Sequence, residues 1–326
     1  VYIVQVESAY IRYEDNAYYV HNSDDKKGFE ISASDTVAFV RGSVRLKKSW
    51  LDILSQLEKV GVCMVNSRNT VELTSDKYRT YLKLMDFGLT QPKTVLIPNK
   101  DGVEEALEAL DSDFPIIMKT LEGSKGVGVL FVESERSLTS LVQLLFNQDE
   151  NTDLLIQEFK KTEYDVRVIV LGGKVIGAMQ RDVVKGDFRS NVSQGAEVKG
   201  FDLTELEIEQ SLLAAKAVDG KWAAVDFIPS ENRETEPPYI LEVNHSPGTA
   251  GVEKATKLNI IKSVIEHYAN PDNRYSVGTE CGYYETLDIK PFGQLIAKFD
   301  TGNSKKNVLH AEDVKVSGKK ISFKLN

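Results

Sequence analysis

The glycine-rich stretch KTLEGSKGVGVLFVES, residues 119–134, restricts the fold of this chain more than any other segment. In dinucleotide-binding and P-loop folds a helix follows the glycines directly and receives the phosphate at its N-terminus. Here the following segment, VGVLFV, is β-rich and apolar, which excludes both folds and predicts a strand, a loop and a second strand. Such a loop can still close over a triphosphate with its backbone N–H groups. An ordinary hairpin is the alternative.

A second informative stretch is YILEVNHSPG, residues 239–248, in which polar residues interrupt an apolar strand. Side chains alternate along a strand, so Glu242 and Asn244 are predicted to share one face, and Leu241 and Val243 the other. Polar residues at a strand end can also simply be solvated or cap the following turn.

An acidic residue in a second apolar strand strengthens the functional interpretation. Asp226 lies in AAVDFI, and we expect this strand to pair antiparallel with that of Glu242 and Asn244. A buried Asp beside a buried Glu is costly unless a proton or a cation is bound. The three oxygen-bearing side chains therefore favour Mg2+ completed by substrate phosphates. His245 has no spaced partner for zinc and is predicted to be a local hydrogen-bonding residue.

Several cationic side chains could serve as phosphate ligands. Lys119 ends the apolar strand FPIIMK, Lys77 lies in the first turns of a predicted helix, and KGDFRSNVSQGA offers Arg189 with Ser190 and Asn191. Each could be a solvated surface charge. Together with the acidic residues they are better explained as phosphate ligands.

The composition narrows the class of protein. The 326 residues carry a formal charge of -9, which argues against general binding to nucleic acid or to a membrane surface. Only two cysteines, Cys63 and Cys281, are present, so a disulfide framework is not indicated. No apolar run approaches the roughly 20 residues that span a bilayer. We expect a cytoplasmic protein.

The pattern along the chain predicts an α/β (α+β) protein with three parts. Residues 1–72 show strand-like pieces, beginning with VYIVQV, around a helix that ends at Gly61. Residues 73–272 mix helices and strands, with a helix capped by Thr74 or Ser75 and a hairpin turn at Gly172 and Gly173. Residues 273–326 comprise a linker and short strands.

The ordered motifs of this chain resemble the ATP-grasp superfamily, and in particular the RimK-type ligases, which add glutamate to the C-terminus of a ribosomal protein. In order, the motifs are TSDKYRTYLKLMDFGL, IIMKTLEGSKGVGV, LLIQEF, DVRVIV, KGDFRSNVSQGA, AAVDFI and YILEVNHSPGTAGVEKAT, over about residues 35–270. The resemblance implies an ATP-grasp fold preceded by a small α/β pre-ATP-grasp domain and followed by a short β extension.

The resemblance also implies roles for individual residues. Lys77 and Lys119 would hold the α- and β-phosphates, and Gly126 would lie in the nucleotide lid. The remaining nucleotide contacts would come from Gln157, from the backbone of Glu158 and Phe159 at adenine, and from Asp165. Arg189, Ser190 and Asn191 would lie along the polyphosphate and the reacting carboxylate, Arg189 and Asn191 being catalytic. Asp226, Glu242 and Asn244 would hold two Mg2+ ions, which Mn2+ could replace.

The last part of the chain carries a separate signal. Asp300-Thr301-Gly302 follows the apolar segment QLIAKF and resembles the start of a retropepsin-like, ATP-dependent zinc protease domain. An aspartic protease needs two carboxylates that share a proton, and this segment supplies one. We therefore expect no peptidase activity from this chain.

The resulting functional hypothesis is an ATP- and Mg-dependent carboxylate-amine ligase acting through an acylphosphate. Its substrates would be an amino acid such as glutamate and a carboxylate acceptor, the C-terminus of a peptide or protein. A homo-oligomer is compatible with this hypothesis, and neither nucleic acid nor membrane is an expected partner. The alternatives are a small-molecule ligase that makes a dipeptide or glutamylates a cofactor, and a nucleotide-binding regulator without catalytic activity.

Overall fold

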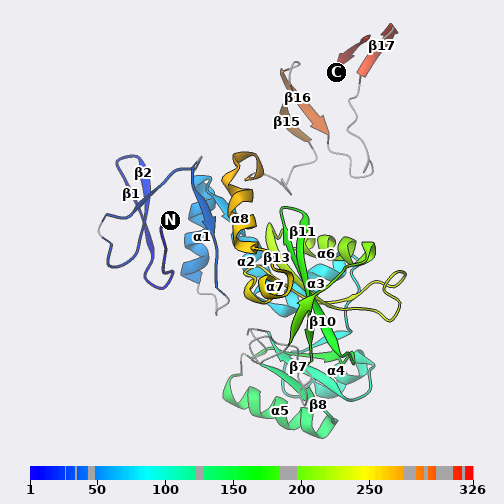
Figure 1. Ribbon diagram of the computed structural model, residues 1–326. Helices are drawn as coiled ribbons and strands as arrows, with labels where there is room; N and C mark the ends of the chain where they lie inside the picture. Colours follow the sequence, from blue (N-terminus) through cyan, green and yellow to red (C-terminus); the bar gives the residue numbers. More distant parts are fainter. Residues whose placement is uncertain are drawn as a thin grey trace. The chain divides into compact units, whose positions relative to one another are not determined.

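The computed structural model describes residues 1–25, 27–33, 35–42, 48–121, 128–150, 152–183 and 197–274, together with the backbone of four later strands. The chain divides into two compact units, Val1–Val277 and Gly278–Asn326. Figure 1 traces the chain in sequence colours. The first unit contains every described residue of the predicted site, and it is mixed α/β, as the sequence predicts.

The N-terminal region contains two small sheets. The first is antiparallel and has the order β1 (Tyr10–Glu14), β2 (Ala17–His21), β3 (Phe29–Ile31). The second pairs β4 (Val37–Phe39) and β5 (Cys63–Val65) in parallel, joined through α1 (Lys48–Val60). The predicted helix ending at Gly61 is confirmed.

The predicted first strand VYIVQV is wrong, because no strand forms before Tyr10. The amide group of Asn22 takes the place of a neighbouring strand there. It accepts a hydrogen bond from the Gln5 N–H at 2.8 Å and donates one to the Ile3 carbonyl at 2.8 Å. Hydrogen bonds from a side chain to the backbone compete with the backbone hydrogen bonds that pair neighbouring strands of a sheet.

Two helices connect this region to the main body. They are α2 (Arg68–Thr74) and α3 (Lys77–Asp86). The N-cap of α3 is Asp76, whose carboxylate accepts hydrogen bonds from the Tyr78 and Arg79 N–H groups at 2.9 Å each. The predicted caps Thr74 and Ser75 are wrong, because these residues end the unpredicted helix α2.

A four-stranded antiparallel sheet forms one wall of the site. Its order is β6 (Thr94–Ile97), β9 (Leu154–Glu158), β7 (Ile116–Thr120), β8 (Val129–Val132). Helices α4 (Val103–Leu110) and α5 (Glu135–Gln148) cover one face (Figure 1). Along β7, Ile116 and Met118 pack into the core with these helices. By the alternation of side chains, Ile117 and Lys119 face the other way.

A five-stranded antiparallel sheet forms the opposite wall. Its order is β12 (Val198–Gly200), β11 (Lys174–Asp182), β10 (Tyr164–Leu171), β13 (Trp222–Ile228), β14 (Tyr239–Asn244). The helices that follow or connect its strands are α6 (Glu205–Ala217), α7 (Ala250–Thr256) and α8 (Ile260–Ala269), with a short 3-10 turn at Pro271–Asn273. Val166, Val168, Val225 and Phe227 are fully buried in the core on one side of this sheet.

The hairpin between β10 and β11 turns at Gly172 and Gly173, as the sequence predicts. Both glycines have positive φ, +54° and +74°. Two consecutive positive φ values are typical of a two-residue type I′ hairpin loop. This tight loop pairs Leu171 with Lys174, and an irregularity between Ile169 and Val170 then shifts the register by one residue, so that Asp165 and Arg181 lie directly opposite each other.

The second unit is described by its backbone strands alone. Two antiparallel pairs are present, β15 (Tyr284–Ile289) with β16 (Gly293–Lys298) and β17 (Ala311–Ser317) with β18 (Lys320–Leu325). The segment Asp300-Thr301-Gly302 lies outside the described residues, so its resemblance to a retropepsin-like domain stays a prediction. Among the described helices of the chain, none is long and apolar enough to cross a bilayer.

Candidate functional site

A cleft of about 180 Å³ lies between the four-stranded and five-stranded sheets. Ile117, Lys119 and Gln157 line it from the first sheet, and Asp165, Arg181, Asp226 and Glu242 from the second. Its apolar lining consists of Pro92, Ile117, Val129, Phe159, Val183, Ile228 and Leu241. The cleft therefore combines apolar walls suited to a flat ring with cations and carboxylates suited to phosphates and a metal ion.

Two lysines converge at the end of β7. The Lys119 ammonium group donates to the Gln157 Oε1 atom at 2.7 Å. The Lys77 ammonium group donates to the carbonyls of Thr120 and Leu121 at 3.0 and 3.1 Å. Burial lowers the pKa of Lys119 to about 8, the nearby Glu242 raises it and the charge of Lys77 lowers it further. Two adjacent cations of this kind favour a polyanionic ligand.

The predicted adenine-binding segment lies at the end of β9. The Glu158 N–H donates to the Lys93 carbonyl at 2.9 Å, so this donor is used within the protein. The Glu158 carboxylate pairs with the Lys160 ammonium group. Phe159 packs edge-on against Phe131, with ring centroids 5.1 Å apart. The Phe159 backbone, and not the Glu158 N–H, is therefore the better candidate for the adenine contact.

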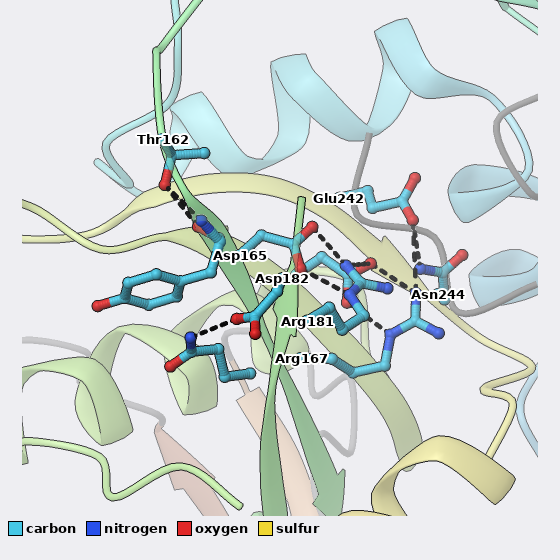
Figure 2. A network of polar contacts seen from close by, with 10 residues as sticks. Thr162, Asp165, Arg167, Arg181, Asp182, Glu242 and Asn244 are labelled. Atoms are coloured by element: carbon cyan, nitrogen blue, oxygen red, sulfur yellow. Dashed lines mark hydrogen bonds and ion pairs between the residues drawn. The ribbon is translucent and has the colours of Figure 1, made fainter. Parts of the chain in front are cut away.

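Two arginines surround the predicted metal ligand Asp226. The Arg167 guanidinium donates from Nε and Nη2 to both carboxylate oxygens, at 2.7 and 2.6 Å. Arg181 approaches the same carboxylate at 3.0 Å while it forms a bidentate pair with Asp165 at 2.6 and 2.7 Å. Figure 2 shows this network, with Glu242 and Asn244 beside it.

The charges of this network keep Asp226 ionised. Burial opposes ionisation, since the residue is 2% exposed, but the positive charges of Arg167 and Arg181 outweigh it and hold the pKa of Asp226 well below its usual range. Burial likewise opposes the charge on both arginines, and the neighbouring carboxylates outweigh it, so the pKa of each guanidinium is raised. All three groups are therefore charged at neutral pH.

The strands β13 and β14 pair antiparallel, as the sequence predicts, and their register places Glu242 directly opposite Asp226. The Asn244 Nδ2 atom donates to the Glu242 Oε1 atom at 2.8 Å, so the two side chains share a face, which is also as predicted. The prediction that Leu241 faces away with Val243 is wrong. The pairing register shifts between Asp226 and Phe227, and this irregularity turns Leu241 into the cleft.

Sequence reasoning did not identify Arg167 and Arg181. A signal was present for Arg167, because the segment DVRVIV places charged residues at alternate positions among apolar ones. That alternation places Asp165 and Arg167 on the face opposite to Val166 and Val168. The cross-strand partners of these residues could not be read from the sequence.

His245 is 6% exposed, and its Nδ1 atom lies 2.7 Å from the Thr74 hydroxyl. The local hydrogen-bonding role predicted for this residue is confirmed. Across the described residues, no three or more His, Cys, Asp and Glu side chains gather into a metal-binding group. The oxygen set of Asp226, Glu242 and Asn244 contains two carboxylates and one amide, which is compatible with Mg2+ that also binds phosphate oxygens.

Four predicted site residues, Gly126, Arg189, Ser190 and Asn191, lie outside the described residues. The structure brings together the other predicted residues around one cleft: Lys77, Lys119, Gln157, Glu158, Phe159, Asp165, Asp226, Glu242 and Asn244. Their assigned roles remain predictions.

Comparison with known proteins identifies the family of this chain. Residues 74–268 match the RimK-like ATP-grasp domain. A protein named "Probable alpha-L-glutamate ligase" from Coxiella burnetii is 35% identical over 229 residues, which cover 69% of this chain and 74% of that protein. A protein of the same name from Thioalkalivibrio sulfidiphilus is 32% identical over 257 residues, which cover 77% of this chain and 83% of that protein.

Solved structures share the fold at lower identity. The ATP-grasp ligase PsnB complexed with minimal precursor matches with a TM-score of 0.59 and 17% identity, over 83% of this chain and 89% of that one. The D-alanine–D-alanine ligase of Bacillus anthracis matches with a TM-score of 0.51 and 20% identity, over 68% of this chain and 73% of that one. The chain therefore belongs to the RimK-like ATP-grasp family of carbon–nitrogen ligases.

Proposed function

We propose that this protein uses ATP and Mg2+ to join an amino acid, glutamate being the first candidate, to the carboxyl terminus of a peptide or protein. The observation that carries the proposal is the cleft that Lys119 lines from one sheet and Asp226 and Glu242 line from the other. A triphosphate needs cations along its length and, at its reacting end, carboxylates that hold Mg2+. The names of the sequence relatives support glutamate as a substrate.

In the proposed reaction, an oxygen of the acceptor carboxylate attacks the γ-phosphorus of ATP, and the bond from that phosphorus to ADP breaks. The nitrogen of the amino acid then attacks the carbonyl carbon of the acylphosphate. Phosphate leaves, the nitrogen loses a proton and an amide remains. Bound Mg2+ would neutralise the phosphate oxygens as the carboxylate approaches.

The protein's own residues supply positioning and charge. We assign Lys77 and Lys119 to the α- and β-phosphates, and Asp226, Glu242 and Asn244 to Mg2+. Arg167 and Arg181 hold Asp226 ionised and oriented, which is the state that a metal ligand requires. Arg189 and Asn191 are assigned to the transferring phosphoryl group.

The proposal is tested by incubating the protein with ATP, Mg2+, glutamate and acceptor peptides, measuring ADP release and identifying products by mass spectrometry. We expect ADP, phosphate and a peptide extended by one or more residues. Hydroxylamine in place of the amino acid should give a hydroxamate, because it traps an acylphosphate. Formation of AMP and pyrophosphate would instead indicate adenylation and contradict the proposed mechanism.

A small-molecule ligase differs from this proposal in the acceptor alone, so free amino acids and small carboxylates belong in the same screen. A nucleotide-binding regulator without activity would bind ATP and release no ADP with any acceptor.

A further inference from the structure

Arg41, which the reaction described above does not use, is held against the turn that follows β14. Its Nη2 atom donates to the Pro247 carbonyl at 2.7 Å. The next residue, Gly42, donates its N–H to the Ser246 hydroxyl at 3.0 Å. These two bonds join the loop after β4 to a turn more than 200 residues later in the chain, so the position of Arg41 is fixed by the fold.

The guanidinium group of Arg41 also lies over an aromatic ring. Its Cζ atom is 4.6 Å from the centroid of the Trp222 ring. A guanidinium that stacks on an aromatic ring keeps its N–H edge available for a planar acceptor. The one hydrogen bond to Pro247 uses one of the five N–H donors.

The charge of Arg41 is not neutralised within the described part of the chain. Arg167, Arg181 and Arg233 each form a short ion pair with a carboxylate. No described carboxylate forms an ion pair with Arg41, although its side chain is held in one place. An anchored and uncompensated guanidinium favours an anionic ligand from outside the protein.

The position of Arg41 relative to the cleft indicates which part of a substrate it would meet. Along β14, Leu241 lines the apolar end of the cleft, and Glu242 and Asn244 follow. Pro247 lies in the turn after the strand ends at Asn244. At about 3.3 Å per residue, Pro247 lies at most roughly 10 Å past Asn244. Trp222, over which the Arg41 guanidinium lies, precedes Asp226 by four residues on β13, so a ligand of Arg41 would lie beyond the predicted Mg2+ ligands.

We propose that Arg41 binds a carboxylate of the amino-acid substrate that does not react, and so makes the enzyme select amino acids over simple amines. This inference rests on the proposed function. The carboxylate that becomes phosphorylated must approach the γ-phosphate beside the metal ligands. A second carboxylate a few bonds further away suits the α-carboxylate of the incoming amine.

The test compares Arg41→Gln and Arg41→Lys with a matched control, Arg12→Gln. Arg12 also lies over an aromatic ring, that of Tyr19 at 5.8 Å, but it is paired with Glu14 and lies outside the cleft. Each protein is titrated with L-glutamate, L-alanine and their α-carboxamides. ADP release measures turnover, and calorimetry in the presence of Mg2+ and ADP measures binding.

We expect Arg41→Gln to raise the KM and Kd of the amino acids about tenfold or more, with the KM of ATP unchanged. The α-carboxamide of alanine should bind wild type and variant equally. Arg41→Lys should keep part of the affinity for the amino acids. The control Arg12→Gln should show none of these effects. Unchanged melting temperature and ATP affinity show that a variant is folded.

The outcomes separate this inference from the proposed function. Equal affinity of Arg41→Gln and wild type for the amino acids overturns the role of Arg41, whatever the turnover. Wild type that binds amino acids no better than their carboxamides overturns it as well. Binding that depends on Arg41 without any ADP release contradicts the proposed reaction and leaves the assignment of Arg41 supported.

Discussion

Lys119 is a cation that the folded protein holds at a cost. Burial disfavours its charged form and Lys77 adds repulsion, so that its pKa falls to about 8. A bound triphosphate would reverse this shift, because opposite charge at short range stabilises the ammonium form. The lysine therefore links nucleotide binding to pH.

The pKa of Lys119 lies below its usual value in the free protein, and we expect it to rise in the complex with ATP. Above about pH 8, ATP binding should therefore be accompanied by uptake of a proton by Lys119. We expect ATP affinity to be constant below that pH and to fall above it, by at most about tenfold per pH unit. Calorimetry in buffers of different ionisation enthalpy measures the proton uptake. Lys119→Arg keeps its charge, so it should bind with a flat profile between pH 7 and pH 9.5. An equal pH dependence in both proteins would exclude Lys119 as its source.

The predicted metal ligands are tested by Glu242→Gln and Asn244→Ala. Each change removes an oxygen ligand, so Mg-dependent ADP formation should fall by at least about a hundredfold while the fold is retained. The control Glu266→Gln alters an exposed carboxylate that pairs with Lys262 on α8, and it should be neutral. Near-normal turnover in either cleft variant would refute the metal assignment.

Arg167→Met tests the energetic role of the ion pair with Asp226. Removing one partner leaves a buried carboxylate with Arg181 alone, and we expect the free energy of unfolding to fall by about 3 kcal/mol. The double variant Arg167→Met with Asp226→Asn should recover part of the loss. Urea unfolding measures both, and the exposed pair of Arg12 and Glu14 gives a control in which Arg12→Met costs less than about 1 kcal/mol. An equal cost at both positions would show that burial of Asp226 does not matter.

Among the secondary-structure elements, the hairpin of β10 and β11 offers a matched pair of glycines. A Cβ atom at Gly172 would meet the His267 ring at 2.5 Å, whereas one at Gly173 would meet nothing within 4 Å. Both residues have positive φ, so Gly173→Ala should cost about 1 kcal/mol from backbone strain alone. Gly172→Ala should cost more, because its Cβ atom would also clash with the His267 ring. This additional cost should disappear when Gly172→Ala is made together with His267→Ala. Thermal unfolding of wild type, the three single variants and the double variant Gly172→Ala with His267→Ala checks this, and equal costs at the two glycines would contradict it.

Elements with strong periodicity were predictable from the sequence, and elements held by tertiary contacts were not. The helix Lys48–Val60 and the glycine hairpin follow from local patterns. Helix α2 was missed because its seven residues are too few for a periodic signal. The false strand at residues 1–6 is apolar enough to suggest β-structure, but the amide of Asn22 bonds to its backbone instead.

For the molecule as a whole, every described residue of the predicted site belongs to the unit Val1–Val277. A chain that ends at Val277 should therefore bind ATP and release ADP as the whole chain does. The whole chain should not cleave glutamate-extended peptides, because Asp300 supplies one of the two carboxylates that an aspartic protease needs. Cleavage that disappears in Asp300→Asn would disprove this, and loss of ATP binding on truncation would show that the site needs the second unit.

The site as a whole was less predictable than its parts. The sequence motifs identified Lys119, Asp226 and Glu242 individually, because charges in apolar strands are conspicuous. They could not show that Arg167 and Arg181 neutralise Asp226, since that depends on which strands are neighbours and in which register. Arg41 was missed for the same reason, as its contact with Pro247 joins two distant parts of the chain.

The irregular pairing of β14 with β13 has a consequence for protein engineering. Because one extra residue is accommodated there, Leu241 and Glu242 both reach the cleft, and the strand changes phase between its first and second halves. A design that regularised this strand by deleting one residue would keep its hydrophobicity and its length almost unchanged. It would nevertheless rotate either the apolar wall or the acidic ligand out of the cleft, so the spacing of residues in β14 constrains the site as well as their identity.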